Sequence, residues 1–166
     1  MDKKNSNEKG STFKSRLIDP PNTEIFMPVA ISIGNRKGGV GKTTLTTNLA
    51  NELSKAGYKV VMLDLDSQTD LTDMNLKQDT EYNIHDILKG RSLLNGTIYK
   101  VNNGEGQDII PGSSNLDEIG TKIKQSLELI IDELKEIYDI VLFDHPPGLN
   151  KISIEKGVTF IGQYRE

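Results

Sequence analysis

The sequence predicts an α/β protein with a doubly wound, mostly parallel sheet. Three observations predict this class: short apolar runs alternate with helical patterns, a glycine-rich turn follows the first run, and aspartates end two later runs. Continuous apolar runs are typical of strands that helices cover on both faces. Alternation of such strands with helices indicates a doubly wound fold.

The composition is that of an ordinary intracellular domain. The chain has 166 residues, a formal net charge of -4 and no cysteine. This length suggests one domain, and the missing cysteines exclude a disulfide scaffold, a thiolate metal site and a cysteine nucleophile. No uncharged stretch is long enough to span a bilayer, and the polar start excludes a secretory signal. We therefore expect a soluble, cytoplasmic protein with no membrane segment.

Residues 1–28 are expected to be a flexible polar leader. They contain Pro20-Pro21 and few large apolar side chains before Ile25. Such a segment buries too little apolar surface to offset the entropy that is lost on ordering.

A βαβ unit follows the leader. Residues 29–33 are a short apolar strand that Gly34 ends, and residues 60–63 are a second one. Gly57 lies where the C-cap of the intervening helix is expected. The apolar residues of that helix have the spacing of one buried face: Leu45, Leu49, Leu53 and Ala56.

The middle of the chain is polar up to residues 82–89, which form a short amphipathic helix closed by Gly90. We expect His85 to lie on the surface of this helix. Residues 108–110 are the next strand, and Pro111-Gly112 stops it.

The last helix and strand have the clearest patterns. Residues 139–144 form an apolar strand that Pro146-Pro147 follows. Before it, Ser114 and Asp117 have the spacing of a capping box. The long helix that begins there has one buried stripe, with apolar residues three or four apart: Leu116, Ile119, Ile123, Leu127, Ile130, Leu134 and Ile137.

The segment 35–44, between the first strand and the first helix, predicts a phosphate-binding loop. Phosphate is bound by converging backbone amides, and glycines let the chain approach it closely. The helix start adds partial positive charge, Lys42 can reach the β- and γ-phosphates, and the Thr43 hydroxyl suits a magnesium ligand. The alternative is a glycine turn with two solvated lysines.

This loop resembles the deviant Walker A motif of the ParA/MinD family of ATPases. The strict Walker A pattern is not met, because Arg36 stands where its first glycine would be. The resemblance implies a P-loop NTPase-like fold with ATP and Mg²⁺ as cofactors. It also implies that Lys37 contacts nucleotide phosphate across the interface of an ATP-dependent homodimer and acts there as a catalytic residue. The nucleotide-binding residues that it implies are Lys37, Gly38, Gly39, Val40, Gly41, Lys42, Thr43 and Thr44.

Two aspartates end the second strand, at the sheet edge where doubly wound proteins bind ligands. The segment 64–68 resembles the family's Asp-x-Asp-Pro-Gln motif, with Ser67 in place of proline. By this resemblance, Asp66 is a catalytic residue that orients or activates the attacking water, and Asp64 helps to form the magnesium site. Either aspartate could instead cap the following turn.

Asp144 ends the last strand, and the segment 144–147 resembles the family's Asp-x-Pro-Pro motif. The resemblance implies that Asp144 holds Mg²⁺ as a Walker B aspartate, together with Thr43. His145 replaces a residue that is often small or cysteine in the family. We expect its side chain to be solvated or hydrogen-bonded rather than catalytic.

The resemblance extends from about Val29 to Asn150, so we predict a ParA-like P-loop ATPase domain over residues 29–150. Family members continue through several more strands and helices. Residues 151–166 are therefore expected to be a divergent or truncated tail, and the sheet to be truncated after the strand that ends at Asp144, with an exposed edge.

The resemblance implies an ATP-binding and ATP-hydrolysing dimerisation switch that acts in plasmid or chromosome partition with a ParB-like partner. Nonspecific DNA binding, on which nucleoid association depends, would need basic residues that the family carries mostly beyond residue 150. The alternative is a non-catalytic, truncated fragment that binds ATP or a full-length relative without turnover. A membrane-bound, MinD-like protein is disfavoured, because no amphipathic helix ends the chain.

Overall fold

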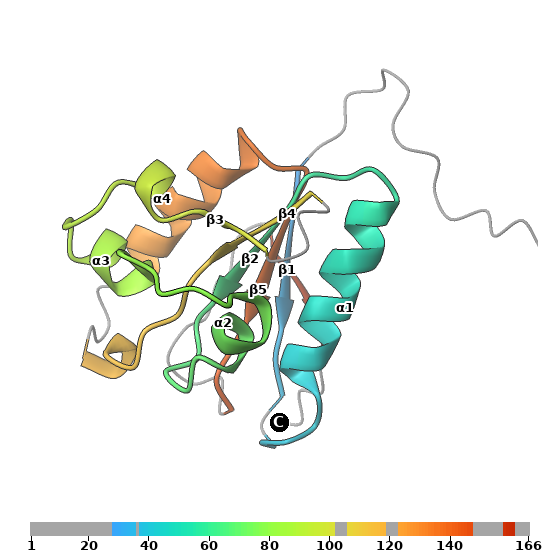
Figure 1. Cartoon of the computed structure of the whole chain (residues 1–166), viewed down its shortest axis with the longest axis horizontal. Coiled ribbons are helices and arrows are strands. Elements are labelled where there is room, and N and C mark those ends of the chain that lie inside the picture. Colours follow the sequence, from blue (N-terminus) through green and yellow to red (C-terminus); the bar gives the residue numbers. More distant parts are fainter. Residues whose placement is uncertain (1–27, 36, 102–105, 119–122, 148–157, 162–166) are drawn as a thin grey trace, which may run out of the picture.

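The computed structural model describes residues 28–35, 37–101, 106–118, 123–147 and 158–161. Its six strands form one sheet in the order β3-β4-β2-β5-β1-β6 (Figure 1). They are β1 Val29–Ile33, β2 Val60–Asp64, β3 Tyr99–Lys100, β4 Gln107–Ile110, β5 Ile140–Asp144 and β6 Val158–Ile161. The helices are α1 Lys42–Lys55, α2 Asp70–Asn75, α3 Ile84–Leu88 and α4 Ile123–Lys135, with 3₁₀ turns η1 Leu94–Gly96 and η2 Leu116–Glu118. All of the paired strands run parallel except β3 and β4, which confirms the predicted fold class.

Apolar layers cover both faces of the sheet. Successive side chains of a strand point to opposite faces. Val61 and Leu63 of β2 therefore belong to the core that includes α4, whereas Val60 and Met62 belong to the core that includes α1. Figure 1 shows these two helices on opposite sides of the sheet. All residues of β2 are buried, as in a central strand of a parallel sheet.

Helix α1 packs through smaller residues than the sequence predicts. Thr46 and Ala50 are its buried residues, while Leu49 and Leu53 are partly buried against the core. These four positions have the helical spacing of a sheet-facing stripe. Leu45, which has the helical spacing noted in the sequence, lies outside the stripe and is 45% exposed.

The long helix predicted before β5 is described in two parts, η2 and α4, because residues 119–122 lie outside the described ranges. Leu127, Ile130 and Leu134 are buried as predicted. Ile137 follows the end of α4 and is exposed, and Asp117 accepts a hydrogen bond from the Ser67 hydroxyl (3.1 Å). None of the helices in the described ranges is long and apolar enough to cross a membrane.

Three elements have no counterpart in the sequence patterns. Helix α2 forms in the polar stretch after β2, β3 is a two-residue antiparallel strand, and β6 arises within the predicted tail. Strand β6 pairs in parallel with β1, so the sheet continues by one strand beyond β1. The leader, except residue 28, and the tail outside β6 lie beyond the described residues.

The carboxyl ends of β1, β2 and β5 lie side by side. In the sheet register, Ile33 of β1 and Asp64 of β2 each align with Asp144 of β5. The segments that follow these strands therefore meet at one edge of the sheet, which is where ligands bind in doubly wound proteins.

Candidate functional site

The glycine-rich segment joins β1 to the start of α1. Gly39 (φ 68°) and Gly41 (φ 84°) have left-handed backbone conformations, which glycine adopts without the strain that a side chain would cause. Gly41 is the N-cap of α1, and its carbonyl accepts the first helical bond from Leu45 N (2.9 Å). The backbone amides at the start of α1 therefore face the end of the loop, as an anion site requires.

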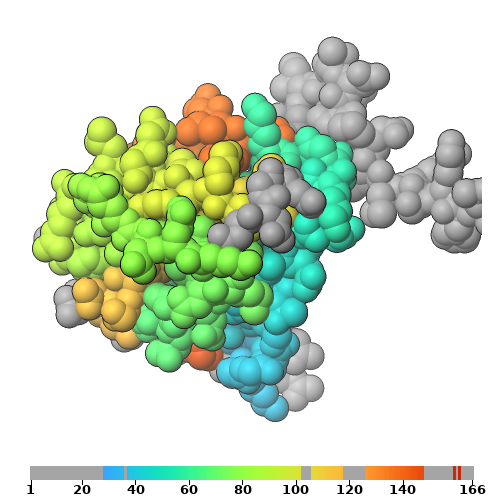
Figure 2. All heavy atoms as spheres, in the orientation of Figure 1, coloured from blue at the N-terminus to red at the C-terminus, as the bar shows by residue number. Residues whose placement is uncertain are grey.

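A cavity of about 720 Å³ lies between this loop and α2. Most of the predicted nucleotide-binding residues line it, together with Asp66 and with Pro147 after β5. In Figure 2 the blue atoms of the loop and the green atoms of the α2 region adjoin at the lower edge of the molecule. The predicted residues in its lining are Gly38, Gly39, Gly41, Lys42, Thr43 and Thr44.

Lys37 and Val40 are exposed and are not among the residues that line the cavity. The backbone N–H of Lys37 donates a hydrogen bond to Asn35 Oδ1 (3.1 Å), which bends the loop just before its glycines. The structure therefore gives Lys37 no contact with the cavity within one chain, and its predicted role across an interface stays a prediction.

Thr43 lines the cavity and contacts Asp144, which is buried and is not among the lining residues. Thr43 Oγ1 donates a hydrogen bond of 2.6 Å to Asp144 Oδ2, although the residues are 101 positions apart. Asp144 Oδ1 is buried and has no hydrogen-bond partner among the described residues. Burial raises the pKa of Asp144 to about 6, and the Asp64 charge raises it too, against the Thr43 hydrogen bond and the Lys42 charge. A buried carboxylate with an open oxygen beside a hydroxyl fits a hard cation such as Mg²⁺.

Asp64 is fully buried (0% exposed) and does not line the cavity. Its Oδ2 accepts hydrogen bonds from the Thr72 backbone N–H (2.9 Å) and hydroxyl (2.7 Å), and its Oδ1 accepts one from Asp66 N (3.1 Å). Burial raises its pKa to about 6 against the Thr72 hydrogen bonds. In this conformation Asp64 caps the turn that follows β2, which is the alternative to a role in the magnesium site.

Asp66 both lines the cavity and caps a turn. Its Oδ1 accepts a hydrogen bond from Gln68 N (3.0 Å), and its carbonyl accepts one from Thr69 N (3.0 Å). Thr69 has a positive φ of 58°, a strained conformation for a β-branched residue, directly before α2. This turn places Asp66 in the lining of the cavity. The positive φ of Thr69 raises the local backbone energy of the turn.

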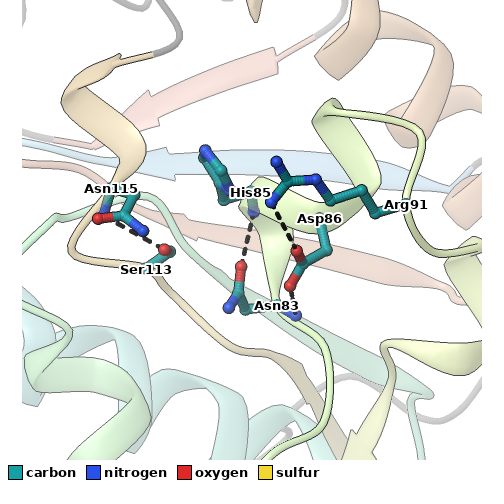
Figure 3. Close-up of polar contacts among 6 residues, drawn as sticks. All are labelled: Asn83, His85, Asp86, Arg91, Ser113 and Asn115. Atoms are coloured by element: carbon teal, nitrogen blue, oxygen red, sulfur yellow. Dashed lines mark hydrogen bonds and ion pairs between the residues drawn. The ribbon is translucent and has the colours of Figure 1, made fainter.

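Both histidines are buried. His145 is 2% exposed, which excludes the solvated state among the two that were expected, solvated or hydrogen-bonded, and burial lowers its pKa to about 4. His85 is also buried, not on the helix surface as predicted. It sits inside the capped first turn of α3, where its backbone N–H donates to Asn83 Oδ1 (3.0 Å) (Figure 3).

The polar residues around α3 form a cluster separate from the cavity (Figure 3). Asn83 and Asp86 make a capping box, Arg91 lies 3.9 Å from Asp86, and the Ser113 hydroxyl accepts from Asn115 N (3.3 Å). Ile84 N donates to the carbonyl of Pro111 (2.9 Å). This bond ties α3 to the loop after β4, which contacts Asp64.

Sequence reasoning missed Thr72, Gly112 and Gln68. Thr72 lies in a polar stretch that has no helical or strand periodicity. Gly112 was interpreted only as the end of a strand. A glycine directly after a buried strand can mark a close approach of another group, and this was the one available signal.

The comparisons with known proteins agree with this geometry. Residues 29–159 match a family model described as an AAA domain. The chromosome-partitioning ATPase Soj of Thermus thermophilus is 33% identical over 125 residues, which cover 75% of this chain and 48% of Soj. The septum site-determining protein MinD of Pyrococcus horikoshii, solved with Mg-ADP, is 36% identical with a TM-score of 0.65, covering 75% of this chain and 51% of that one.

A plasmid partition protein from Borrelia burgdorferi is 33% identical with a TM-score of 0.64, covering 74% of this chain and 57% of that one. The chain thus spans about half the length of these relatives. The loop before α1, with its threonine bonded to a strand-end aspartate, defines a P-loop nucleotide-binding protein. Within that class, the chain belongs to the ParA/MinD family of P-loop ATPases.

Proposed function

We propose that this protein binds ATP with Mg²⁺, hydrolyses it, and acts as a ParA-type dimerisation switch in plasmid or chromosome partition. The observation that carries the proposal is the hydrogen bond that joins Thr43, in the lining of the phosphate-loop cavity, to Asp144 at the end of β5. Relatives that are named for chromosome or plasmid partition support the cellular role. The role is a proposal for the whole, longer type of protein, because this chain spans about half of such relatives.

The residues divide the chemical work in this proposal. The loop amides and Lys42 bind the phosphates, and Thr43 and Asp144 hold Mg²⁺, which would neutralise charge on the phosphate oxygens. Asp66 accepts a hydrogen bond from the attacking water and orients it. His145 is buried, and because its pKa is about 4 it stays neutral and exchanges no proton near neutral pH.

A second copy of the chain completes the site in this proposal. Three exposed apolar side chains lie in the loop, in the first turn of α1 and in α2: Val40 (47% exposed), Leu45 and Met74 (54% exposed). Exposed apolar residues that gather at one place are typical of a surface that a partner covers. Lys37, exposed at the same loop, would reach the nucleotide of the partner copy. A ParB-like protein would stimulate hydrolysis, and DNA binding would need basic residues from elsewhere.

The first test measures Mg-ATP binding and turnover in three alanine variants. Lys42→Ala should abolish both, because the loop loses its phosphate contact. Lys37→Ala should keep binding and lose about 10³-fold in turnover, in the range of an arginine finger supplied in trans. Lys55→Ala is the control, since Lys55 lies in the last turn of the same helix and pairs with Glu52. Hydrolysis that is unchanged in Lys37→Ala would remove the trans role.

A second candidate function is a nucleotide-binding module without turnover, because Lys37 does not line the cavity within one chain. Such a module would bind ATP or a full-length relative and regulate it. Equilibrium binding of labelled ATP, followed by a single-turnover assay on the same sample, separates the two. Saturable binding with no phosphate release would select the module.

A further inference from the structure

The two oxygens of Asp64 are already used by donors from the protein. Oδ2 accepts both the backbone N–H and the hydroxyl of Thr72, and Oδ1 accepts the backbone N–H of Asp66. Asp144 differs, because its Oδ1 is buried with no partner among the described residues. A cation at Asp64 would have to displace hydrogen bonds to an ionised group, which are the strong ones in proteins. A cation at Asp144 meets an open oxygen.

Gly112, in the loop after β4, lies against Thr72 and Asp64. Its backbone N–H donates to Thr72 Oγ1 (2.8 Å), so the Thr72 hydroxyl accepts from Gly112 and donates to Asp64. A Cβ at position 112 would lie 2.8 Å from Asp64 Cγ and Oδ2, nearer than side-chain atoms pack. The loop after β4 therefore rests directly on the carboxylate, and only glycine permits it.

We infer that Asp64, Thr72 and Gly112 form a positioning latch that holds Asp66 at the cavity, and that Asp64 is not a magnesium ligand. The latch joins the end of β2, the first turn of α2 and the loop after β4 through one buried carboxylate. The bond from Asp66 N to Asp64 Oδ1 fixes the backbone of Asp66, and the bond from Gln68 N to Asp66 Oδ1 fixes its side chain. The inference rests on the proposed function, because it takes Asp66 as the residue that orients water.

Thr72→Val tests the latch with the smallest change of shape. Valine keeps the volume of threonine but removes the hydroxyl that links Gly112 to Asp64. We expect kcat to fall about tenfold to a hundredfold, because misplacing a positioned group costs rate, while KM for ATP and the Mg²⁺ requirement stay unchanged. Thr72→Ser restores the hydroxyl and should restore kcat, which a loss of packing alone would not predict.

Gly112→Ala reaches the latch from the opposite side. Its Cβ should push Asp64 away and reproduce the kcat defect of Thr72→Val. Gly96→Ala is the matched control, because a Cβ there would meet only Ser92 Oγ at an ordinary 3.4 Å. Gly96 lies in η1, outside the lining of the cavity, so this variant should match the wild type.

Amide hydrogen exchange gives a readout that needs no activity. In the nucleotide-free protein, Thr72→Val should speed exchange at Asp66, Thr72 and Gly112 and leave the central strand β5 protected. Exchange that is unchanged at these amides would overturn the latch. If the wild type binds ATP without turnover, the hydrolytic part of the proposed function fails. The amide exchange rates then test by themselves whether the positioning latch exists.

The magnesium titration decides the second half of the inference. Asp144→Asn should raise the Mg²⁺ concentration needed for tight ATP binding about tenfold or more, whereas Asp64→Asn should leave it unchanged. A matching rise in Asp64→Asn, together with an unaffected Thr72→Val, would show Asp64 to be a magnesium ligand and overturn the inference.

Discussion

The Asp144 carboxylate is buried, and burial disfavours its charged form. It is 1% exposed, and its raised pKa comes first from burial and then from the neighbouring Asp64. A carboxylate is tolerated in such a position when it serves a ligand rather than the fold. The residue therefore lowers the stability of the nucleotide-free protein while it prepares a cation site.

Asp144→Asn should stabilise the nucleotide-free protein at pH 7.5. The folded pKa of about 6 lies above the reference value of 3.8, so the folded state binds the proton more tightly than the unfolded state does. The stability that comes from this proton is complete below about pH 4 and is lost as the pH rises through 6. Asparagine stays neutral, and its oxygen can still accept from Thr43.

We expect the free energy of unfolding to rise by about 1–3 kcal/mol at pH 7.5, since a shift of one pKa unit corresponds to about 1.4 kcal/mol. Near pH 4 the two proteins should be equally stable, because Asp144 is then neutral. Urea denaturation at both pH values, without Mg²⁺, measures this difference. An Asp144→Asn protein that is less stable at pH 7.5 would contradict the role of charge burial.

The motifs named residues that line the cavity, such as Thr43, and residues that do not, such as Lys37 and Asp64. Asp66 and Thr43 lie at the cavity because the phosphate loop and the strand ends place them there. His85 was expected on the helix surface and His145 was expected to be solvated or hydrogen-bonded, and both are buried. Their burial depends on α3 and β5 packing against distant segments, which a single sequence does not reveal.

At the level of elements, strong patterns were found and weak ones were missed. Strands β1, β2, β4 and β5 lie where the apolar runs predicted them. Helix α2 has six polar-rich residues, and its shape depends on the Asp64 latch rather than on its own periodicity. Strand β3 has only two residues, so its pattern could not be recognised.

One contact joins α4 to the antiparallel edge of the sheet. The hydroxyl of Tyr138, just after α4, donates to Asp108 Oδ2 of β4 (2.6 Å), and Lys100 Nζ of β3 lies 2.8 Å from Asp108 Oδ1. Burial raises the pKa of Tyr138 far above its ordinary value, and the hydrogen bond to Asp108 adds to the rise. Tyr138 is therefore a donor to a buried carboxylate at any physiological pH.

Tyr138→Phe should destabilise the protein by about 1–3 kcal/mol, because it removes one of the two donors to the buried Asp108 Oδ2 and leaves only Lys100 Nζ (2.9 Å). The ring still fills its place, so packing is retained. Chemical denaturation measures the loss. Asp108→Asn and the double variant complete a mutant cycle that isolates the Tyr138–Asp108 contact. Purely additive losses of stability would contradict a specific role of this bond.

The whole molecule is needed to assemble the nucleotide site. Thr43 follows β1 and Asp144 ends β5, and only the folded sheet brings these distant residues to 2.6 Å. The fold class could be predicted because alternating apolar runs leave few ways to cover a parallel sheet. The extra strand β6 could not, since its four residues lie where no family motif was recognised.

Mg-ATP should therefore stabilise the protein as a unit. A ligand that binds only the folded state at 100 times its Kd adds about 2.7 kcal/mol to the free energy of unfolding. Urea denaturation with ATP alone, with Mg²⁺ alone and with both measures this gain at pH 7.5.

The added effect of Mg²⁺ should shrink near pH 5, because protons compete for Asp144, whose pKa is about 6. In Asp144→Asn, ATP should still stabilise, but Mg²⁺ should add less than in the wild type, and its effect should not shrink between pH 7.5 and pH 5. Saturable binding of Mg-ATP without any gain in stability would mean that the nucleotide binds outside the folded sheet, and the assignment of Thr43 and Asp144 would fail.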